Sequence, residues 1–180
     1  VVLLTQDALP ADDYCLENLV KPLQDPQIIA SFGRQIPRPD ASPTENFTRL
    51  FNYPETPIVK GREELPELGI KTFFLSNVCS AIKTKEFKEL GGFPENIVMF
   101  EDLIFAAKAI LKGYKIAYVP DARVWHSHNF SLIQQWMLIT PQRRMASSIP
   151  AMVEHYREHF GLDKSDLSED IDFSVDDLDE

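Results

Sequence analysis

The sequence is short of several features that mark particular classes of protein. Only two of its 180 residues are cysteines, Cys15 and Cys79, and neither lies in a CxxC pair, which excludes a disulfide framework and a thiolate zinc cluster. No apolar run approaches the roughly 20 residues of a membrane-spanning helix, and no basic stretch precedes an apolar one at the start, as in a secretory signal. We therefore predict no transmembrane segment, a reducing compartment, and two buried, unpaired cysteines.

Positive charge is also scarce. There are 18 Lys and Arg against 28 Asp and Glu, and the net charge is -10. Nine of the acids and one Lys lie in residues 163–180, so the rest of the chain is nearly neutral and offers no basic face to a polyphosphate backbone. We predict no nucleic-acid binding. The acidic segment has too few apolar side chains to offset the entropy of ordering, which predicts a domain at 1–162 and a disordered tail at 163–180.

Hydrophobic periodicity predicts strands that alternate with helices. The expected strands cover residues 1–5, 28–35, 70–75, 115–119 and 122–125, the first of them as a buried strand. The expected helices cover residues 84–90, 101–112 and 131–160, a stretch from Asp12 or Asp13 to residue 24, and a short stretch from Thr44 to residue 52. Residues 53–69, with three prolines, are expected to be irregular. This alternation predicts an α/β fold with a partly parallel sheet, in which ligands bind at the carboxyl ends of strands.

The last expected strand ends at two histidines, His126 and His128, which share a face if the strand continues past them. That spacing suits a pair of metal ligands, although two histidines without a third ligand are a weak signal. Asp7 follows the first strand and could supply the third ligand, although a lone strand-end Asp more often caps a turn. A carboxylate with imidazoles suits Mg2+ or Mn2+ better than structural zinc.

Two other polar pairs stand where elements begin or end. Ser76-Asn77 follow the expected strand at 70–75, and Glu101-Asp102 open the expected helix at 101–112. The helix macrodipole favours carboxylates at this end and keeps them ionised. A role as ordinary N-terminal caps explains the acidic pair equally well.

Seven motifs in a fixed order resemble family-2 glycosyltransferases, and within them the rhamnosyltransferase branch. They are Thr5-Gln6-Asp7-Ala8, Gly33-Arg34-Gln35-Ile36-Pro37, Ser76-Asn77, Leu90-Gly91-Gly92-Phe93-Pro94, Glu101-Asp102, Gly113-Tyr114 and Ala122-Arg123-Val124-Trp125-His126-Ser127-His128-Asn129. The resemblance covers residues 1 to about 135, and several motifs in the right order are far more specific than any one of them. It does not extend over residues 136–149.

The resemblance implies a GT-A-like α/β fold, with a mixed sheet flanked by helices. In the family, strand and helix units upstream of the motif at Asp7 grip the nucleoside, so the chain is expected to lack the N-terminal nucleotide-binding units and to be a truncated catalytic domain, inactive alone. The implied partners are a nucleotide-sugar donor and a saccharide acceptor, with a divalent metal, Mg2+ or Mn2+, at the donor pyrophosphate. Homo-oligomerisation is left open, and the implied location is the cytoplasm or the inner face of the membrane.

Matching the motifs residue by residue implies a role for each. Asp7 stands at the last acid of the family's DxD motif, whose first acid is absent here, and is the implied metal-side carboxylate. His126 matches the histidine that completes the metal site, with His128 as the second choice, and Asp102, beside Glu101, matches the general base. The implied substrate-side residues, with Arg34 a candidate for a phosphate or acceptor contact, are Gln6, Arg34, Gln35, Ser76 and Asn77.

These residue types suit glycosyl transfer. A sugar hydroxyl is a poor nucleophile, so a carboxylate must accept its proton as it attacks the anomeric carbon. The leaving nucleoside diphosphate gathers negative charge, which a metal neutralises. A single displacement predicts inversion, whereas a glycosidase needs two carboxylates across the scissile bond, which this order of motifs does not indicate.

The resulting hypothesis is a hexosyltransferase that moves a sugar from a nucleotide-sugar donor, with dTDP-rhamnose foremost, to a saccharide hydroxyl in surface polysaccharide synthesis. Two alternatives remain: a family-2 transferase with another donor, and a non-catalytic interaction module that keeps the fold. Loss of the first DxD acid and of the nucleotide-binding half favours the module. Joint retention of Asp7, Asp102 and His126 favours the enzyme.

Overall fold

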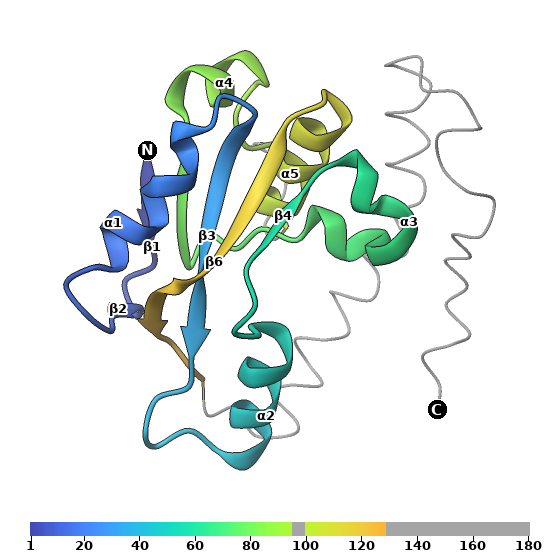
Figure 1. Ribbon diagram of the computed structural model, residues 1–180. Helices are drawn as coiled ribbons and strands as arrows, with labels where there is room; N and C mark the ends of the chain where they lie inside the picture. Colours follow the sequence, from blue (N-terminus) through green and yellow to red (C-terminus); the bar gives the residue numbers. More distant parts are fainter. Residues whose placement is uncertain (95–99, 129–180) are drawn as a thin grey trace. The chain divides into compact units, whose positions relative to one another are not determined.

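A six-stranded sheet forms the centre of the computed structural model, which describes residues 1–94 and 100–128 (Figure 1). Its strands are β1 (Val2–Leu4), β2 (Leu9–Pro10), β3 (Ile28–Ile36), β4 (Ile58–Lys60), β5 (Cys79–Ile82) and β6 (Lys115–Trp125). The expected helix at 131–160 and the acidic tail at 163–180 lie outside the described residues, and both stay predictions.

The order of the strands brings distant parts of the sequence to one edge. The sheet runs β1-β5-β3-β6-β2, and β4 also pairs with β6. Among the described strands, β3 and β6 are parallel and the other pairs are antiparallel, so the prediction of a mixed, partly parallel sheet is confirmed. Ile36 lies opposite Trp125, and Leu9 lies on the other side of Trp125. The ends of β3 and β6 and the turn before β2 therefore meet.

Short helices surround this sheet. They are α1 (Cys15–Val20), η1 (Lys21–Gln24), α2 (Pro43–Asn52), η2 (Arg62–Glu64), α3 (Leu65–Leu68), η3 (Gly69–Phe73), α4 (Thr84–Glu89) and α5 (Glu101–Leu111). α1 packs its buried Cys15 and Leu19 against Cys79 and Val124 of the sheet, and both cysteines are buried and free, as predicted. α5 confirms the helix predicted at 101–112; it is mostly apolar and is followed by Gly113 at φ +87°, the left-handed conformation in which many helices end.

One predicted strand was wrong. Most of the strand predicted at 70–75 belongs instead to η3, which begins at Gly69 with φ +51° and closes with a hydrogen bond from Phe74 N to Lys71 O of 3.1 Å. The strand lies instead at β5, with all four of its residues buried. Ser76 and Asn77 thus precede a strand rather than follow one.

Other boundaries also differ from the predictions. The region predicted to be irregular, 53–69, contains β4, η2 and α3, and the two strands predicted at 115–119 and 122–125 form a single strand, β6. The register of β6 against β3 shifts after Gly33, where an added Cβ would lie 2.3 Å from the carbonyl oxygen of Ala122. Ser42 rather than Thr44 is the N-cap of α2.

Apolar side chains of β1 and α1 are exposed within the described residues. β1 was predicted as a buried strand, but it forms the edge of the sheet, and Val2 and Leu4 are more than 40% exposed. On α1, Leu16 and Val20, which follow the same three-and-four spacing as the buried Leu19, are exposed. A periodic pattern marks which residues share a face, and only the neighbours decide whether that face is covered.

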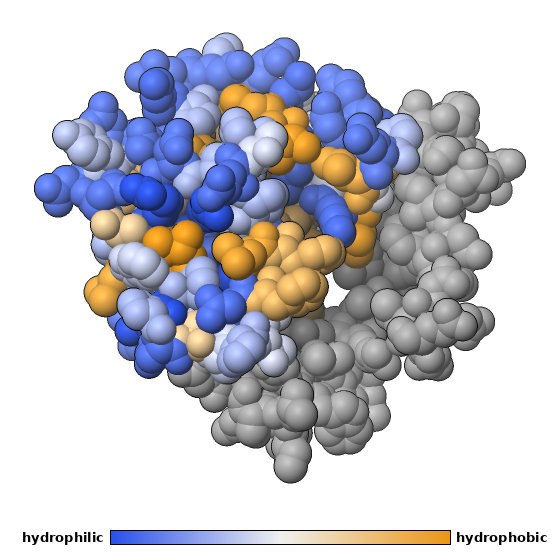
Figure 2. All heavy atoms as spheres, turned by 60° about the horizontal axis from the view of Figure 1, so that its bottom comes forward, coloured by the Kyte–Doolittle hydropathy of each residue, from blue (hydrophilic) through white to orange (hydrophobic). Residues whose placement is uncertain are grey.

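Apolar side chains are also exposed on α2, where Phe47, Leu50 and Phe51 stand at three-and-four spacing. The rings of Phe47 and Phe51 stack with centroids 5.8 Å apart. The face turned forward in Figure 2 shows a group of hydrophobic residues among hydrophilic ones. Within residues 1–94 and 100–128, no helix is long and apolar enough to cross a membrane.

Candidate metal and catalytic site

Three side chains meet where β6 ends beside the turn that precedes β2. The Nε2 atoms of His126 and His128 lie 3.3 Å and 3.5 Å from Oδ2 of Asp7. One ligand atom from each of the three residues lies within 4.8 Å of the others, which is close enough to hold one ion. His126 is buried, whereas the side chains of Asp7 and His128 are 41% and 37% exposed. The cluster is thus open to solvent on one side, and the structure brings these three candidate residues together.

The backbone explains why the two histidines and the aspartate converge. His126 N donates to Ile36 O at 3.0 Å, so pairing with the β3 strand continues one residue past the end of β6. The turn at Asp7 is closed by a hydrogen bond from Ala8 N to the carbonyl of the residue at position 5. Arg38, in the loop after β3, donates to the carbonyl of Asp7 and, through its backbone N, to the hydroxyl of Ser127 at 3.2 Å.

The charges of the cluster suit a cation. Burial, reinforced by the positive charge of Arg49, lowers the pKa of His126 to about 4, so its imidazole is neutral at pH 7. Burial alone would raise the pKa of Asp7, but the Thr5 side chain and the positive charge that His126 takes up in acid outweigh it, and that pKa lies below its ordinary value. A carboxylate and neutral imidazole nitrogens are ligands for first-row divalent metals, and the residues present therefore fit a divalent cation.

Helix α2 supports both histidines, a feature that the sequence analysis did not find. Glu45 is buried and forms an ion pair with Arg49 at 2.6 Å, one turn further along the helix. Glu45 Oε1 also accepts a hydrogen bond from His128 N at 3.2 Å. Arg49 donates to Oε1 of Gln35, and this oxygen lies 2.8 Å from Nδ1 of His126. The spacing of Glu45 and Arg49 is a helical ion-pair signal in the sequence, but nothing local links it to the histidines.

The predicted acidic pair lies in the first turn of α5. Asp102 accepts hydrogen bonds from Asn77 N at 3.1 Å and from Leu103 N at 2.8 Å, and the side-chain amide of Asn77 donates to Glu101. Burial, with the neighbouring charge of Glu101, raises the pKa of Asp102 above its ordinary value. Phe100, immediately before this pair, has φ +68°, the one non-glycine residue with positive φ in the described part of the chain.

A path of hydrogen bonds leads from the cluster of Asp7, His126 and His128 toward the acidic pair. Gln35, already bonded to His126, donates from its Nε2 to the hydroxyl of Ser76 at 2.9 Å. Asn77 follows Ser76 and donates to Asp102. The prediction that Asp7, Asp102 and His126 line one cleft stays a prediction, although this path connects them.

The predicted substrate-side residues occupy different surroundings. Gln6 is exposed in the turn beside Asp7. Arg34 donates to the carbonyl of Tyr53 at 3.1 Å and pairs with Glu55 at 3.0 Å. Gln35 is only 2% exposed. The proposed contacts of these residues with a substrate stay predictions.

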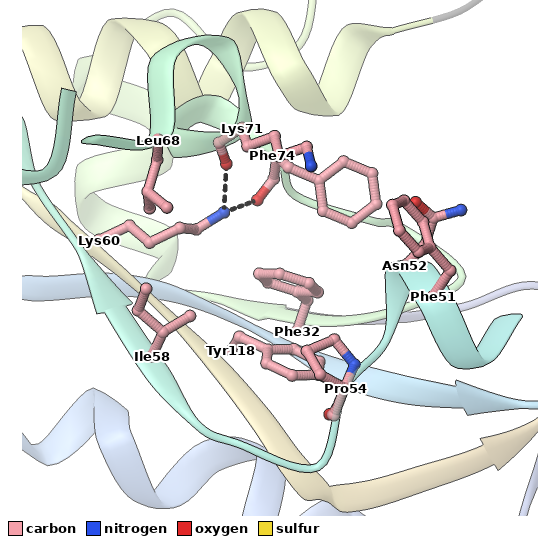
Figure 3. A pocket seen from close by; sticks show the side chains of 10 residues that line it. All are labelled: Phe32, Phe51, Asn52, Pro54, Ile58, Lys60, Leu68, Lys71, Phe74 and Tyr118. Carbon is pink, nitrogen blue, oxygen red and sulfur yellow. Dashed lines mark hydrogen bonds between the residues drawn. The ribbon is translucent and has the colours of Figure 1, made fainter. Parts of the chain in front are cut away.

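A second polar feature, also missed in the sequence, is a buried lysine in an aromatic pocket (Figure 3). The pocket has a volume of about 260 Å3, and its aromatic lining residues are Phe32, Phe51, Phe74 and Tyr118. Lys60 donates to the carbonyls of Lys71, at 3.0 Å, and Phe74, and its Nζ lies 5.0 Å from the centroid of the Phe32 ring. Burial lowers the pKa of Lys60 to about 7.

Comparison with known proteins supports the resemblance seen in the motifs. No family model matches the chain. It is 47% identical over 131 residues to the O-antigen chain rhamnosyltransferase RfbN of Salmonella typhimurium, in a match that covers 73% of this chain and 42% of that protein. It is 42% identical over 136 residues to the O-antigen chain rhamnosyltransferase WbaN of Salmonella anatum, in a match that covers 76% of this chain and 43% of that protein. The chain thus spans less than half the length of these relatives and is similar to rhamnosyltransferases along that span.

The fold has a counterpart among solved structures. The mannosyltransferase PcManGT from Pyrobaculum calidifontis, in complex with GDP-Man and Mn2+, matches 86% of this chain and 39% of its own with a TM-score of 0.55 and 19% identity. At this identity the likeness concerns the fold alone. It confirms the predicted α/β class, a mixed sheet with flanking helices.

Proposed function

We propose that this chain is part of a metal-dependent, rhamnosyltransferase-like enzyme that transfers a sugar from a nucleotide-sugar donor to a saccharide hydroxyl in surface polysaccharide synthesis. The observation that carries the proposal is the convergence of Asp7, His126 and His128 at the ends of β3 and β6, in a chain 42–47% identical to two O-antigen rhamnosyltransferases. dTDP-rhamnose is the proposed donor, because both relatives are named for rhamnosyl transfer.

The metal cluster is the proposed site for the diphosphate of the donor. Asp7 and His126, with His128 as a further ligand, would hold Mn2+ or Mg2+, and PcManGT, whose fold is similar, binds Mn2+ together with GDP-Man. A bound divalent cation would neutralise the negative charge that gathers on the leaving nucleoside diphosphate. The exposed side of Asp7 and His128 leaves room for phosphate oxygens.

Asp102 is the proposed general base. The acceptor hydroxyl attacks the anomeric carbon as the bond to the diphosphate oxygen breaks, and the hydroxyl proton passes to the carboxylate of Asp102. One displacement inverts the configuration at that carbon. The raised pKa of Asp102 strengthens it as a proton acceptor, and its hydrogen bonds from Asn77 N and Leu103 N fix the carboxylate in place.

The test uses a protein of the relatives' full length that carries these residues. With dTDP-rhamnose and a saccharide acceptor, it should release dTDP in the presence of Mn2+ and stop when EDTA removes the metal. GDP-mannose and UDP-glucose serve as comparison donors. Faster release of the nucleoside diphosphate from either of these would mean that its sugar, and not rhamnose, is the one transferred. No release from any donor, with Mn2+ bound, would favour a non-catalytic module.

A further inference from the structure

The side-chain amide of Gln35 lies at the meeting point of four other side chains. Its Oε1 faces Nδ1 of His126 at 2.8 Å and the guanidinium of Arg49. Its Nε2 donates to the hydroxyls of Ser76, at 2.9 Å, and Tyr53. At 2% exposed, the amide is surrounded by protein on every side, and each of its two ends is already engaged.

The contact with Arg49 fixes which way the amide points. A guanidinium has donors and no acceptor, so the atom that it meets must be the amide oxygen. The reverse orientation would place the amide NH2 against the donors of Arg49 and leave the two hydroxyls without its hydrogens. Arg49 is itself held by its 2.6 Å ion pair with Glu45, so the clamp extends back to helix α2.

The fixed amide in turn decides where His126 carries its proton. Because Oε1 only accepts, Nδ1 of His126 must be the donor in their 2.8 Å hydrogen bond. A neutral imidazole has one N–H, so its other nitrogen, Nε2, keeps a free lone pair. That nitrogen lies 3.3 Å from the carboxylate oxygen of Asp7. Two hydrogen-bond acceptors therefore face each other there, and a cation between them would bind to both.

We propose that Gln35, clamped by Arg49, is a positioning residue that holds His126 in its Nδ1–H tautomer and thereby presents the Nε2 lone pair beside Asp7 to a divalent cation. The binding of a cation by Nε2 rests on the proposed function, whereas the tautomer of His126 does not. Histidine ligands of metals commonly donate their other N–H to an oxygen that fixes the ring, and loss of such a partner costs about 10- to 100-fold in metal affinity. Here the oxygen belongs to a side chain 91 residues away.

The first experiment reads the tautomer directly. Long-range 1H–15N spectra of the 180-residue chain, labelled with 15N-histidine and free of metal at neutral pH, should show His126 with its proton on Nδ1. In Gln35→Leu the acceptor is gone and the preference should be lost, whereas Gln35→Glu keeps an oxygen that Arg49 can clamp and should restore it. Tyr53→Phe removes a contact at the other end of the amide and should leave the tautomer unchanged.

The second experiment measures Mn2+ binding by electron paramagnetic resonance in the same variants. Gln35→Leu should bind Mn2+ about tenfold more weakly or worse, and Gln35→Glu should bind within a few-fold of the wild type. A wild-type proton on Nε2, or an unchanged tautomer in Gln35→Leu, would overturn the clamp. The wild-type spectrum needs no variant, so it decides the tautomer even where Gln35→Leu does not fold. An Nδ1–H pattern without Mn2+ binding would support the clamp and count against the metal in the proposed function.

Discussion

The histidine cluster and the Lys60 pocket are two places where this fold buries polar groups, and they do so by opposite means. Around His126 the partners are side chains, supplied by β3, by α2 and by the turn at Asp7. Lys60 instead donates to two backbone carbonyls at the end of η3 and lies over an aromatic ring (Figure 3). The partners of His126 decide which of its two ring nitrogens carries the proton, whereas the ammonium of Lys60 has only donors and its carbonyl partners hold it in place.

Electrostatics sharpens this contrast. Burial lowers the pKa of His126 to about 4 and that of Lys60 to about 7. At neutral pH the histidine is therefore uncharged and keeps a lone pair that can bind a metal. The lysine is near the midpoint of its titration, and carbonyl dipoles and an aromatic ring stabilise its charged form. We expect variants of the first region to change binding and catalysis, and variants of the second to change stability.

The largest expected effect concerns Asp102, which joins the first region through Asn77 and Ser76. Asp102→Asn keeps the shape but removes the proton acceptor, so in the full-length protein kcat should fall by about 100-fold or more while donor binding persists. Release of dTDP and calorimetry with the donor measure the two quantities. Glu101→Gln, in the same helical turn, is the control and should lose far less. Normal turnover by Asp102→Asn would make Asp102 a helix cap and nothing more.

Asp7 should show the next largest effect, on metal affinity. Asp7→Asn removes the one carboxylate of the cluster, and Mn2+ binding by the chain should weaken by about 10- to 100-fold, as measured by electron paramagnetic resonance. Asp12→Asn is a matched control, because Asp12 pairs with Arg123 at 2.8 Å outside the cluster. Equal affinity in Asp7→Asn and the wild type would place the metal elsewhere.

Both regions show what the sequence could and could not predict. The cluster of Asp7 with the histidines was predicted because each residue ends an apolar run, and strand ends meet at one edge. The clamp through Gln35 was not, since its partners are far apart in the chain and no local pattern marks a buried amide as structural. The sequence motifs predict that the Gln35 side chain contacts the substrate. In the structure both ends of its amide are already bonded to protein side chains, four in all.

The Lys60 pocket lies in the region that was predicted least well. The apolar run at 70–75 has the composition of a strand, but Gly69 at φ +51° turns the chain into η3, and Lys60 fastens the resulting carbonyls. β5 was missed because it has only four residues and includes a buried serine, Ser80. Hydrophobic composition reports burial, and here the turn before the run decided its conformation.

A third prediction tests the buried charge of Lys60. The pKa of Lys60 is 10.5 in the unfolded chain and about 7 in the folded state. Between these pH values the unfolded state binds more protons than the folded state, so the free energy of unfolding rises with pH. The free energy of unfolding of the wild type, relative to Lys60→Met, should increase by about 2 kcal/mol from about pH 7 to about pH 9. Urea denaturation at the two pH values measures it. A difference that stays flat would show that the ammonium is not penalised by burial.

The smallest expected effect, a change in stability, tests whether the histidine cluster and the Lys60 pocket are independent. Tyr118 donates to the carbonyl of Pro54 at 2.7 Å in the wall of the lysine pocket, and Tyr118→Phe removes that single hydrogen bond, so the free energy of unfolding should fall by about 1 kcal/mol. Mn2+ affinity should not change. The ring of Tyr53 offers a route for coupling between the two regions, because it lies 6.4 Å from that of Tyr118 while its hydroxyl accepts from Gln35.

Tyr53→Phe is the paired variant, since it removes the hydroxyl on the side of the histidine cluster and leaves the ring. If the regions are independent, its cost in stability adds to that of Tyr118→Phe within about 0.5 kcal/mol in the double variant. Urea denaturation of the wild type, the two single variants and the double variant closes this cycle. A larger coupling energy, or weaker Mn2+ binding in Tyr118→Phe, would mean that the packing of the pocket helps to hold Gln35. The histidine cluster and the Lys60 pocket would then not be independent regions.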